Sequence, residues 1–172
     1  MSNGTKRTRA SASSGKRRTR PDAHAPLTRS EIMARVRGRD TKPEMLVRRM
    51  LHAMGYRYRV QASGVPGRPD VAFTRRRAAV FVHGCFWHGH HCARGSRVPR
   101  ANAEFWRAKI ARNRARDAEV VARLGTAGWK ALVVWECELG DREEVAARLR
   151  EFLGPVRVER RDCWKNGSPS RE

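Results

Sequence analysis

The chain has 172 residues, and its 38 lysines and arginines against 17 acidic residues give a formal net charge of +21. The length fits one domain with flanking tails, and so large a positive charge favours a polyanionic partner, most often nucleic acid. A long apolar span, a lipidation motif and a hydrophobic signal segment are all absent, which disfavours membrane and secreted classes. We therefore expect a cytoplasmic protein with reduced cysteines.

The predicted elements begin after a basic N-terminal segment. Residues 1–27 are poor in apolar side chains and are expected to form a disordered tail. The pattern from Thr28 to Glu31 is typical of a capping box and predicts a short first helix. Thr41 and Glu44 repeat the pattern and open a second helix, which Gly55 ends.

Strands and helices alternate through the rest of the chain. Apolar patterns predict strands at 56–60, 70–74, 78–83 and 129–137; the second and third would form a hairpin, and the last would be buried. Two further helices are predicted at 102–124, with Asn102 as its N-cap, and at 141–152. The order ααβββαβα predicts an α/β fold over residues 28–155, a mixed sheet flanked by helices, with residues 156–172 as a second tail.

One loop after the third predicted strand concentrates cysteine and histidine, the usual zinc ligands. Cys85, His90 and Cys92 are close in sequence, and Cys137 would complete a tetrahedral set from the end of a distant strand. Four protein ligands leave no position for water, so such a zinc would be structural and would fix a loop without a core of its own. Two alternatives stay open, namely His91 in place of His90 and Cys137 as an ordinary buried thiol.

An acidic residue begins the predicted hairpin. Asp70 follows the turn that starts at Gly67, and His83 ends the neighbouring strand, so the two side chains can meet at one edge of the sheet. A carboxylate there can hold Mg²⁺ beside a phosphodiester. The alternative is that Asp70 only caps its turn. Glu44 and Asp117, on predicted helices, are candidate supporting acids.

Four motifs, in this order along the chain, carry a specific resemblance: GRPD (67–70), HGCFWHGHHC (83–92), EFW (104–106) and WEC (135–137). With them the chain resembles the very short patch repair (Vsr) DNA mismatch endonucleases from about Thr28 to Phe152. That family nicks one DNA strand at T·G mismatches left by deamination of 5-methylcytosine. The resemblance implies a restriction-endonuclease-like fold, a monomer at the nucleoid, and mismatch-repair proteins as candidate partners.

The resemblance also implies roles for the acidic site. Asp70 would bind the catalytic Mg²⁺ together with the backbone carbonyl of Val82, and Glu44 would contact metal-bound water. It implies a structural zinc at the cysteine–histidine set described above.

The resemblance assigns the proton transfer to histidine. His83 and His88 would act near the scissile phosphate, with His88 as the general base through water. Asp117 would orient His88, because an acid behind an imidazole raises its basicity.

Aromatic side chains complete the implied site. Phe86, Trp87 and Trp106 would form a wedge that enters the duplex beside the mismatch, and Met33 would act from the minor groove. The alternatives are ordinary packing for Met33 and a core position for Trp106, although Phe105 is the better core candidate on its helix.

One departure from the family and two rival functions remain. Gly89 stands where a histidine is common, and we expect it to loosen the loop. The first rival is a non-catalytic, zinc-stabilised DNA-binding module. The second is a nuclease whose histidine-rich loop itself holds the catalytic metal.

Overall fold

The computed structural model describes residues 38–156, so the predicted helix at Thr28, the wedge candidate Met33 and the two predicted tails, apart from Val156, lie outside the described residues. The elements are α2 (Lys42–Ala53), β1 (Val71–Phe73), η1 (Thr74–Arg76), β2 (Ala78–His83), α3 (Ala103–Thr126), β3 (Lys130–Trp135), η2 (Glu136–Gly140) and α4 (Arg142–Leu153). None of the helices in the described part is long and apolar enough to cross a membrane.

The three strands form one mixed sheet in the order β1-β2-β3. β1 and β2 form the predicted hairpin, with Val71 opposite Val80 in antiparallel register. β3 runs parallel to β2 and pairs Trp135 with His83. His83 and Trp135 therefore lie side by side at one end of the strands, the same end at which Asp70 precedes β1.

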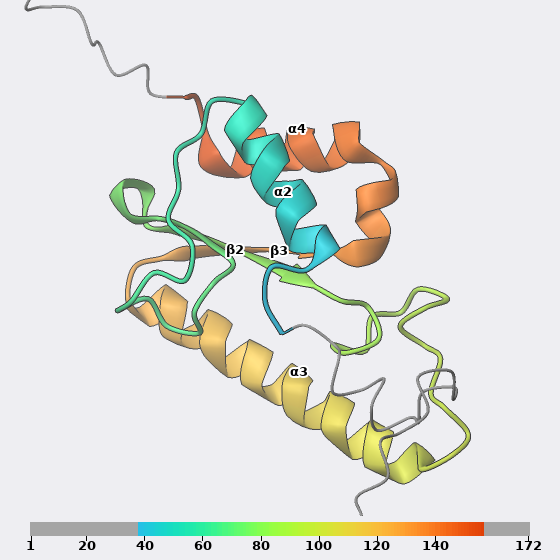
Figure 1. Cartoon of the computed structure of the whole chain (residues 1–172). Coiled ribbons are helices and arrows are strands. Elements are labelled where there is room, and N and C mark those ends of the chain that lie inside the picture. Colours follow the sequence, from blue (N-terminus) through green and yellow to red (C-terminus); the bar gives the residue numbers. More distant parts are fainter. Residues whose placement is uncertain (1–37, 157–172) are drawn as a thin grey trace, which may run out of the picture. The chain divides into compact units, whose positions relative to one another are not determined.

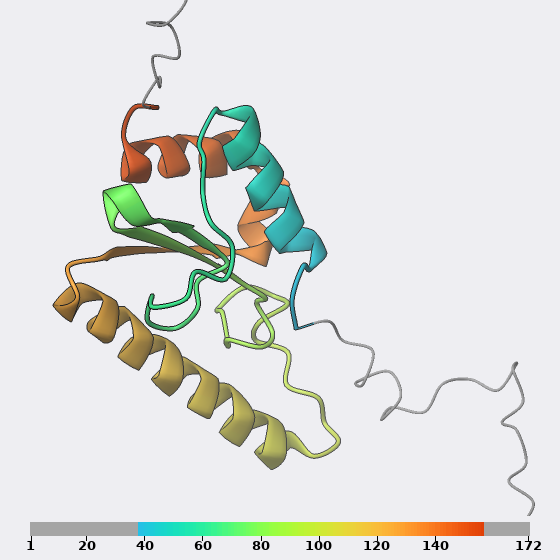
Figure 2. The ribbon, with the colours of Figure 1, turned by 60° about the vertical axis from the view of Figure 1, so that its left-hand side comes forward.

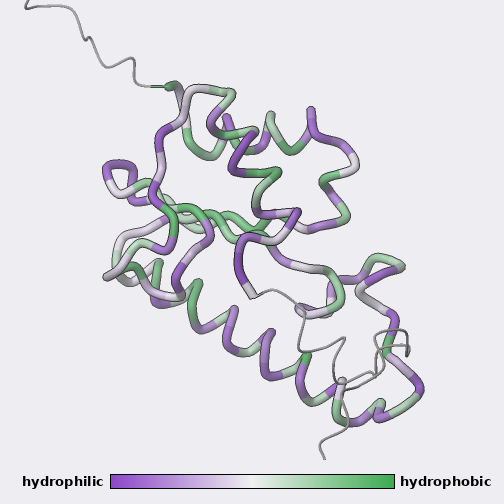
Figure 3. The backbone as a smooth tube through the Cα atoms, viewed as in Figure 1, coloured by the Kyte–Doolittle hydropathy of each residue, from purple (hydrophilic) through white to green (hydrophobic). Residues whose placement is uncertain are grey.

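Helices cover both faces of this sheet, with α2 and α4 on one face and α3 on the other (Figure 1, Figure 2). Side chains alternate between the two sides. Val71 and Val80 join a core with the two shorter helices, whereas Ala72 and Ala79 join a second core with Leu124 of α3. Burial of β1 and of most of β2 on both faces accounts for the mostly hydrophobic colour of these strands (Figure 3). The predicted α/β class is confirmed.

The helix ends follow local rules in two cases out of three. Thr41 caps α2 by accepting a hydrogen bond from the backbone N–H of Glu44, and Gly55 follows the helix with a φ of +88°. Asp141 caps α4 in the same way. Asn102 does occupy the N-cap position of α3, but its φ is +57° and its side chain makes no capping hydrogen bond. Asn102 therefore stands at the expected N-cap position, but its side chain does not cap the helix.

Two strand predictions need correction. Residues 56–60 form no strand, because only Arg59 pairs with the sheet, through a single bridge to Ala72. The apolar run at 129–137 does contain β3, but the strand ends at Trp135 and only Val134 within it is fully buried. β3 lies at the edge of the sheet, and Cys137 belongs to η2 instead of the strand end.

Candidate active site and metal centre

Asp70 lies at the end of a turn that packs tightly on α3. Gly67 has a φ of +76°, and a Cβ there would lie 2.1 Å from Val120 Cγ1, so only glycine allows this approach. Asp70 Oδ2 accepts a hydrogen bond from the backbone N–H of Val82, 2.7 Å away on the neighbouring strand. The carboxylate thus reaches across the hairpin to the neighbouring strand, which does not support a role confined to capping its own turn.

Burial leaves the Asp70 carboxylate poorly solvated. It raises the pKa of Asp70 from an ordinary 3.8 to about 6; the Val82 hydrogen bond opposes this shift, and the nearby Glu44 carboxylate adds to it. Glu44 is only 6 % exposed, and its two oxygens accept hydrogen bonds from the Thr41 hydroxyl and the Asp40 backbone N–H. Two close, poorly solvated carboxylates are a donor set that suits a hard divalent cation such as Mg²⁺.

Two histidines and an acid meet beside this pair of carboxylates. The rings of His83 and His88 stack with centroids 3.8 Å apart, and Asp117 Oδ2 lies 2.5 Å from His88 Nδ1. One ligand atom from each of the three residues lies within 4.8 Å of the others. Burial, followed by the charge of His88, lowers the pKa of His83 to about 4. His83 is therefore neutral near pH 7, and Asp117 fixes the orientation of the His88 ring. Asp70, Glu44, His83, His88 and Asp117 are candidate catalytic residues and are called the catalytic corner below.

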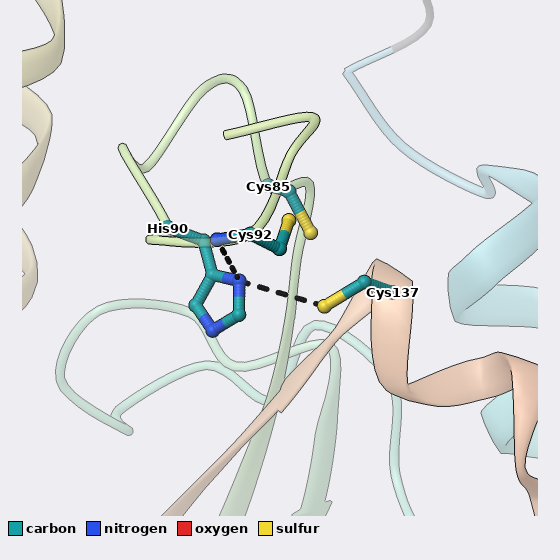
Figure 4. A group of neighbouring side chains, drawn as sticks. All are labelled: Cys85, His90, Cys92 and Cys137. Carbon is teal, nitrogen blue, oxygen red and sulfur yellow. Dashed lines mark hydrogen bonds between the residues drawn. The ribbon is translucent and has the colours of Figure 1, made fainter. Parts of the chain in front are cut away.

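The predicted cysteine–histidine set also comes together (Figure 4). Cys85, His90, Cys92 and Cys137 each place one ligand atom within 4.8 Å of the others. His90 Nδ1 lies 3.4 Å from Cys137 Sγ, and Cys137 comes from η2 while the other three come from the loop. His91 is exposed and outside this set, so His90 is favoured over it. Three thiols and one imidazole nitrogen at this spacing fit a tetrahedral structural zinc. These four residues are called the cysteine–histidine cluster below.

The loop that carries the cluster has no helix or strand between β2 and α3. Its backbone closes on itself, because a Cβ at Gly95 would lie 2.0 Å from the His90 carbonyl oxygen. The hydrogen bond with His90 lowers the pKa of the half-buried Cys92 thiol to about 6, whereas burial raises the pKa of the Cys85 thiol to about 12. A cation that binds thiolate would favour the charged form of both sulfurs.

Sequence reasoning missed Trp135, which joins the two sites. Its ring stacks on His90 with a centroid distance of 4.3 Å, and its edge contacts His83 at 5.3 Å. Its position two residues before Cys137 could have indicated that it lies near the cluster. Only the parallel pairing of β2 and β3 places it beside His83.

The predicted wedge residues form one aromatic cluster. Phe86 lies 5.1 Å from Trp87 and 5.4 Å from Trp106, measured between ring centroids. The preference for Phe105 as the core residue was wrong, because Phe105 is 54 % exposed and Trp106 is 7 % exposed. Trp106 is buried because Phe86 and Trp87 fold over it from the loop, so its packing role and its place in the cluster are compatible.

Two polar residues of α3 hold this aromatic cluster and were not predicted. Lys109 Nζ lies 5.3 Å from the Trp87 ring centroid and 5.5 Å from that of Trp106. The Asn113 side chain donates a hydrogen bond of 2.8 Å to the Trp87 carbonyl. Both residues face the loop and are four positions apart, so they lie on one side of the helix. This spacing could have been recognised in the sequence.

Gly89 does not act as a loose hinge in this loop. Its φ is +62°, and a Cβ would lie 2.6 Å from Ile110 Cγ2 of α3. The glycine lets the loop approach the helix closely, so the expected loosening is replaced by a tight contact.

Comparisons with known proteins show which proteins this chain resembles. The family model described as DNA mismatch endonuclease Vsr matches residues 21–94. The Type II nicking enzyme V.XorIIP of Xanthomonas oryzae is 46 % identical over 134 residues, which cover 78 % of this chain and 98 % of that protein. DNA mismatch endonuclease Vsr of Escherichia coli is 43 % identical over 77 % of this chain and 87 % of its own length. V.NmeAIP of Neisseria meningitidis is 39 % identical over 79 % of this chain and 96 % of its own length.

Proposed function

The chain belongs to the Vsr family of DNA endonucleases, and on that premise we propose that it nicks one strand of double-stranded DNA at T·G mismatches, with Mg²⁺ as catalytic cofactor and a structural zinc. The observation that carries the proposal is the convergence of Asp70, His83, His88 and Asp117 at one edge of the sheet beside the aromatic cluster. Such an enzyme would act in very short patch repair of deaminated 5-methylcytosine. We further infer a restriction-endonuclease-like core and a monomer at the nucleoid.

The Mg²⁺ site would use Asp70 and the backbone carbonyl of Val82. When bound, Mg²⁺ lowers the pKa of water and stabilises charge on the phosphate and the leaving oxygen. Asp70 is held toward β2 by its hydrogen bond with the Val82 N–H, so its second oxygen stays available to the ion. Glu44 is fixed by Thr41 and Asp40 and would order water beside Asp70.

Proton transfer would centre on His88. The Asp117 carboxylate at Nδ1 favours the tautomer that leaves Nε2 free to accept a proton from the attacking water. His83 is neutral and stacked on His88, so it can contact the phosphate without placing a positive charge beside the His88 ring.

The aromatic cluster would supply mismatch selectivity. A wobble pair stacks less well than a normal pair, so separating it costs less. Phe86 and Trp87 are half-buried and lie over Trp106, where they could stack on exposed bases at about 1–3 kcal/mol per base. Met33 would enter the duplex from the minor groove.

A labelled-duplex assay tests the proposal. Duplexes with T·G, T·A or C·G at one position would be incubated with Mg²⁺ or with EDTA, and strand-selective nicking is expected only at T·G with Mg²⁺. Asp70→Asn should bind the T·G duplex but not nick it, whereas Glu119→Gln, at an exposed acid of α3, should nick normally. Nicking of all three duplexes, or equal nicking in EDTA, would refute the assignment.

One observation favours a second arrangement of the catalytic metal. His83, His88 and Asp117 could themselves hold an ion, because their ligand atoms lie within 4.8 Å of one another. In that case His83→Ala would abolish metal binding while Asp70→Asn would retain it. Isothermal titration of both variants with Mg²⁺ and Mn²⁺ distinguishes the two arrangements. The non-catalytic module is not supported, since the relatives are named as nicking enzymes and endonucleases.

A further inference from the structure

The end of the sheet opposite the catalytic corner carries an open pocket of about 440 Å³. Its walls are residues 55–59, which follow α2, and residues 73–76, which turn the β1–β2 hairpin, with Val156 at its rim. The hairpin turn and the loop of the cysteine–histidine cluster lie at opposite ends of the fold in both views (Figure 1, Figure 2). Six residues of β2 at about 3.3 Å each separate the two ends by roughly 17–20 Å.

Positive charge dominates this pocket. Its lining includes Arg57, Arg59, Arg75 and Arg76 and no acidic residue. Among residues 38–156, no carboxylate forms an ion pair with Arg57, Arg59 or Arg76. Like charges held this close repel one another, so an anion bound between the walls would lower the electrostatic energy.

The walls of the pocket are fixed before any ligand binds. Arg76 donates hydrogen bonds to the carbonyls of Leu153 and Pro155, and its guanidinium lies 5.6 Å from the Tyr56 ring centroid. The Tyr56 hydroxyl donates to the Gly154 carbonyl at 2.6 Å. Anchored walls reduce the entropy that binding must cost, while the exposed Arg57 and Arg59 keep most of their donors available.

We propose that this arginine pocket binds the phosphodiester backbone of DNA at a site separate from the catalytic corner. Guanidinium groups pair with phosphate oxygens through two parallel hydrogen bonds, and the half-buried Tyr58 offers an aromatic surface beside them. An acidic peptide could meet the same cations. DNA is favoured because the chain is a DNA endonuclease with a net charge of +21, and DNA presents a phosphate at every step of about 3.4 Å along each strand.

Two sources of DNA have this chemistry. The distance of roughly 17–20 Å from His83 allows either a bent flank of the same duplex or a second duplex to reach the pocket. The inference concerns binding alone, so it stands or falls independently of T·G selectivity and of the catalytic metal.

The test compares the wild-type protein with Arg57→Gln/Arg59→Gln in EDTA, by fluorescence anisotropy at several salt concentrations. The DNA is a hairpin-closed duplex of about 10 base pairs or a duplex of about 40 base pairs. On the long duplex the variant should bind about tenfold more weakly, and its salt slope should fall by about two, one for each lost phosphate contact. On the short duplex both proteins should agree within about twofold.

A third arm identifies the source of the DNA. Protein saturated with the short duplex is mixed with a labelled long duplex. If the wild type captures the long duplex and the variant does not, the pocket binds a second duplex. If the variant differs from the wild type only in the first assay, the pocket binds a flank of the same duplex. Arg123→Gln/Arg142→Gln removes the same charge from exposed positions outside the pocket and should bind like the wild type. Three results would overturn the proposal. The pocket variant could bind the long duplex as tightly as the wild type, or the control variant could lose as much affinity as the pocket variant. Polyglutamate could also compete more strongly than DNA of equal charge.

Discussion

Members of the catalytic corner and of the cysteine–histidine cluster alternate along the ten residues 83–92, yet different interactions hold the two groups in place. His83 ends a strand that is buried on both faces, whereas Cys85, two residues later, begins a loop without helix or strand. Apart from His88, which lies on the loop, the catalytic corner is positioned by strand pairing and by helices that pack on two hydrophobic cores. The cluster is positioned by its own side chains and by the ring of Trp135.

This difference separates stability from activity along a few residues. A change in the catalytic corner should alter chemistry and leave the fold intact, because the core supports its backbone. A change in the cluster should alter the fold of the loop, and with it the aromatic cluster and His88 that the same loop carries. Four predictions test this separation, from the largest expected effect to the smallest.

Removal of one cluster ligand should have the largest effect. His90→Ala should lose bound zinc, lower the melting temperature by more than about 10 °C and abolish nicking, since metal binding supplies folding energy to this loop. The matched control is His91→Ala, at the exposed neighbour outside the cluster, which should keep its zinc and its melting temperature. Zinc content by mass spectrometry and thermal unfolding provide the measurements. A stable, zinc-loaded His90→Ala would break the comparison.

Removal of the proposed general base should affect chemistry alone. His88→Ala should lower kcat by about 10²–10⁴-fold, while thermal unfolding and DNA affinity stay close to wild type. Asp117→Asn should lose part of that activity, about 10–100-fold, because it disturbs the orientation of the ring. Single-turnover nicking measures both changes. Loss of folded structure in His88→Ala would show that the corner depends on the loop more than we infer.

Asp70 should reduce stability at neutral pH in the absence of metal. Its folded pKa of about 6 lies above its ordinary 3.8, so the ionised carboxylate penalises the folded state above pH 6, by up to about 3 kcal/mol. Asp70→Asn should therefore raise the free energy of unfolding at pH 8 in EDTA, and the gain should vanish near pH 4. Urea unfolding across pH measures this difference. An Asp70→Asn protein less stable than wild type at pH 8 would contradict it.

The same series reports on His83. Its folded pKa of about 4 lies below its ordinary 6.5, so stability should fall as the pH drops from 6.5 to 4. In wild type, proton uptake by Asp70 opposes this loss; in Asp70→Asn the loss should be steeper.

The smallest effect is expected at the contact between the loop and α3. Gly89→Ala should lower the free energy of unfolding by about 1–3 kcal/mol, because of its positive φ and the 2.6 Å approach to Ile110. Adding Ile110→Ala should recover the steric part of the loss and leave the backbone part. The open position Gly125, where a Cβ meets nothing within 4 Å, provides the control Gly125→Ala. No recovery in the double variant would argue against the contact.

The sequence predicted those features that depend on local chemistry. The hairpin, the Thr41 cap of α2 and the Asp141 cap of α4 follow from side-chain periodicity and from capping rules that act over a few residues. The four members of the cysteine–histidine cluster were identifiable because few other residues bind zinc and three of them are close along the chain.

Errors arose where packing decided between equivalent patterns. Residues 56–60 alternate like a strand, but only Arg59 pairs with the sheet, and residues 56–59 form one wall of the pocket. Phe105 and Trp106 are adjacent on a helix that contacts the sheet only near its C-terminal end, and the loop, not the helix pattern, selects Trp106 for burial.

By itself, then, the sequence determined most of the elements, the family and the residue types that carry chemistry, because these depend on spacing along the chain. The tertiary structure alone decided that Trp135 lies between the two sites, that Gly89 closes onto α3, and that four arginines line a pocket far from the candidate catalytic residues. Those features depend on which strands pair and which loops meet a helix. Such contacts join residues distant in sequence, and no local pattern encodes them.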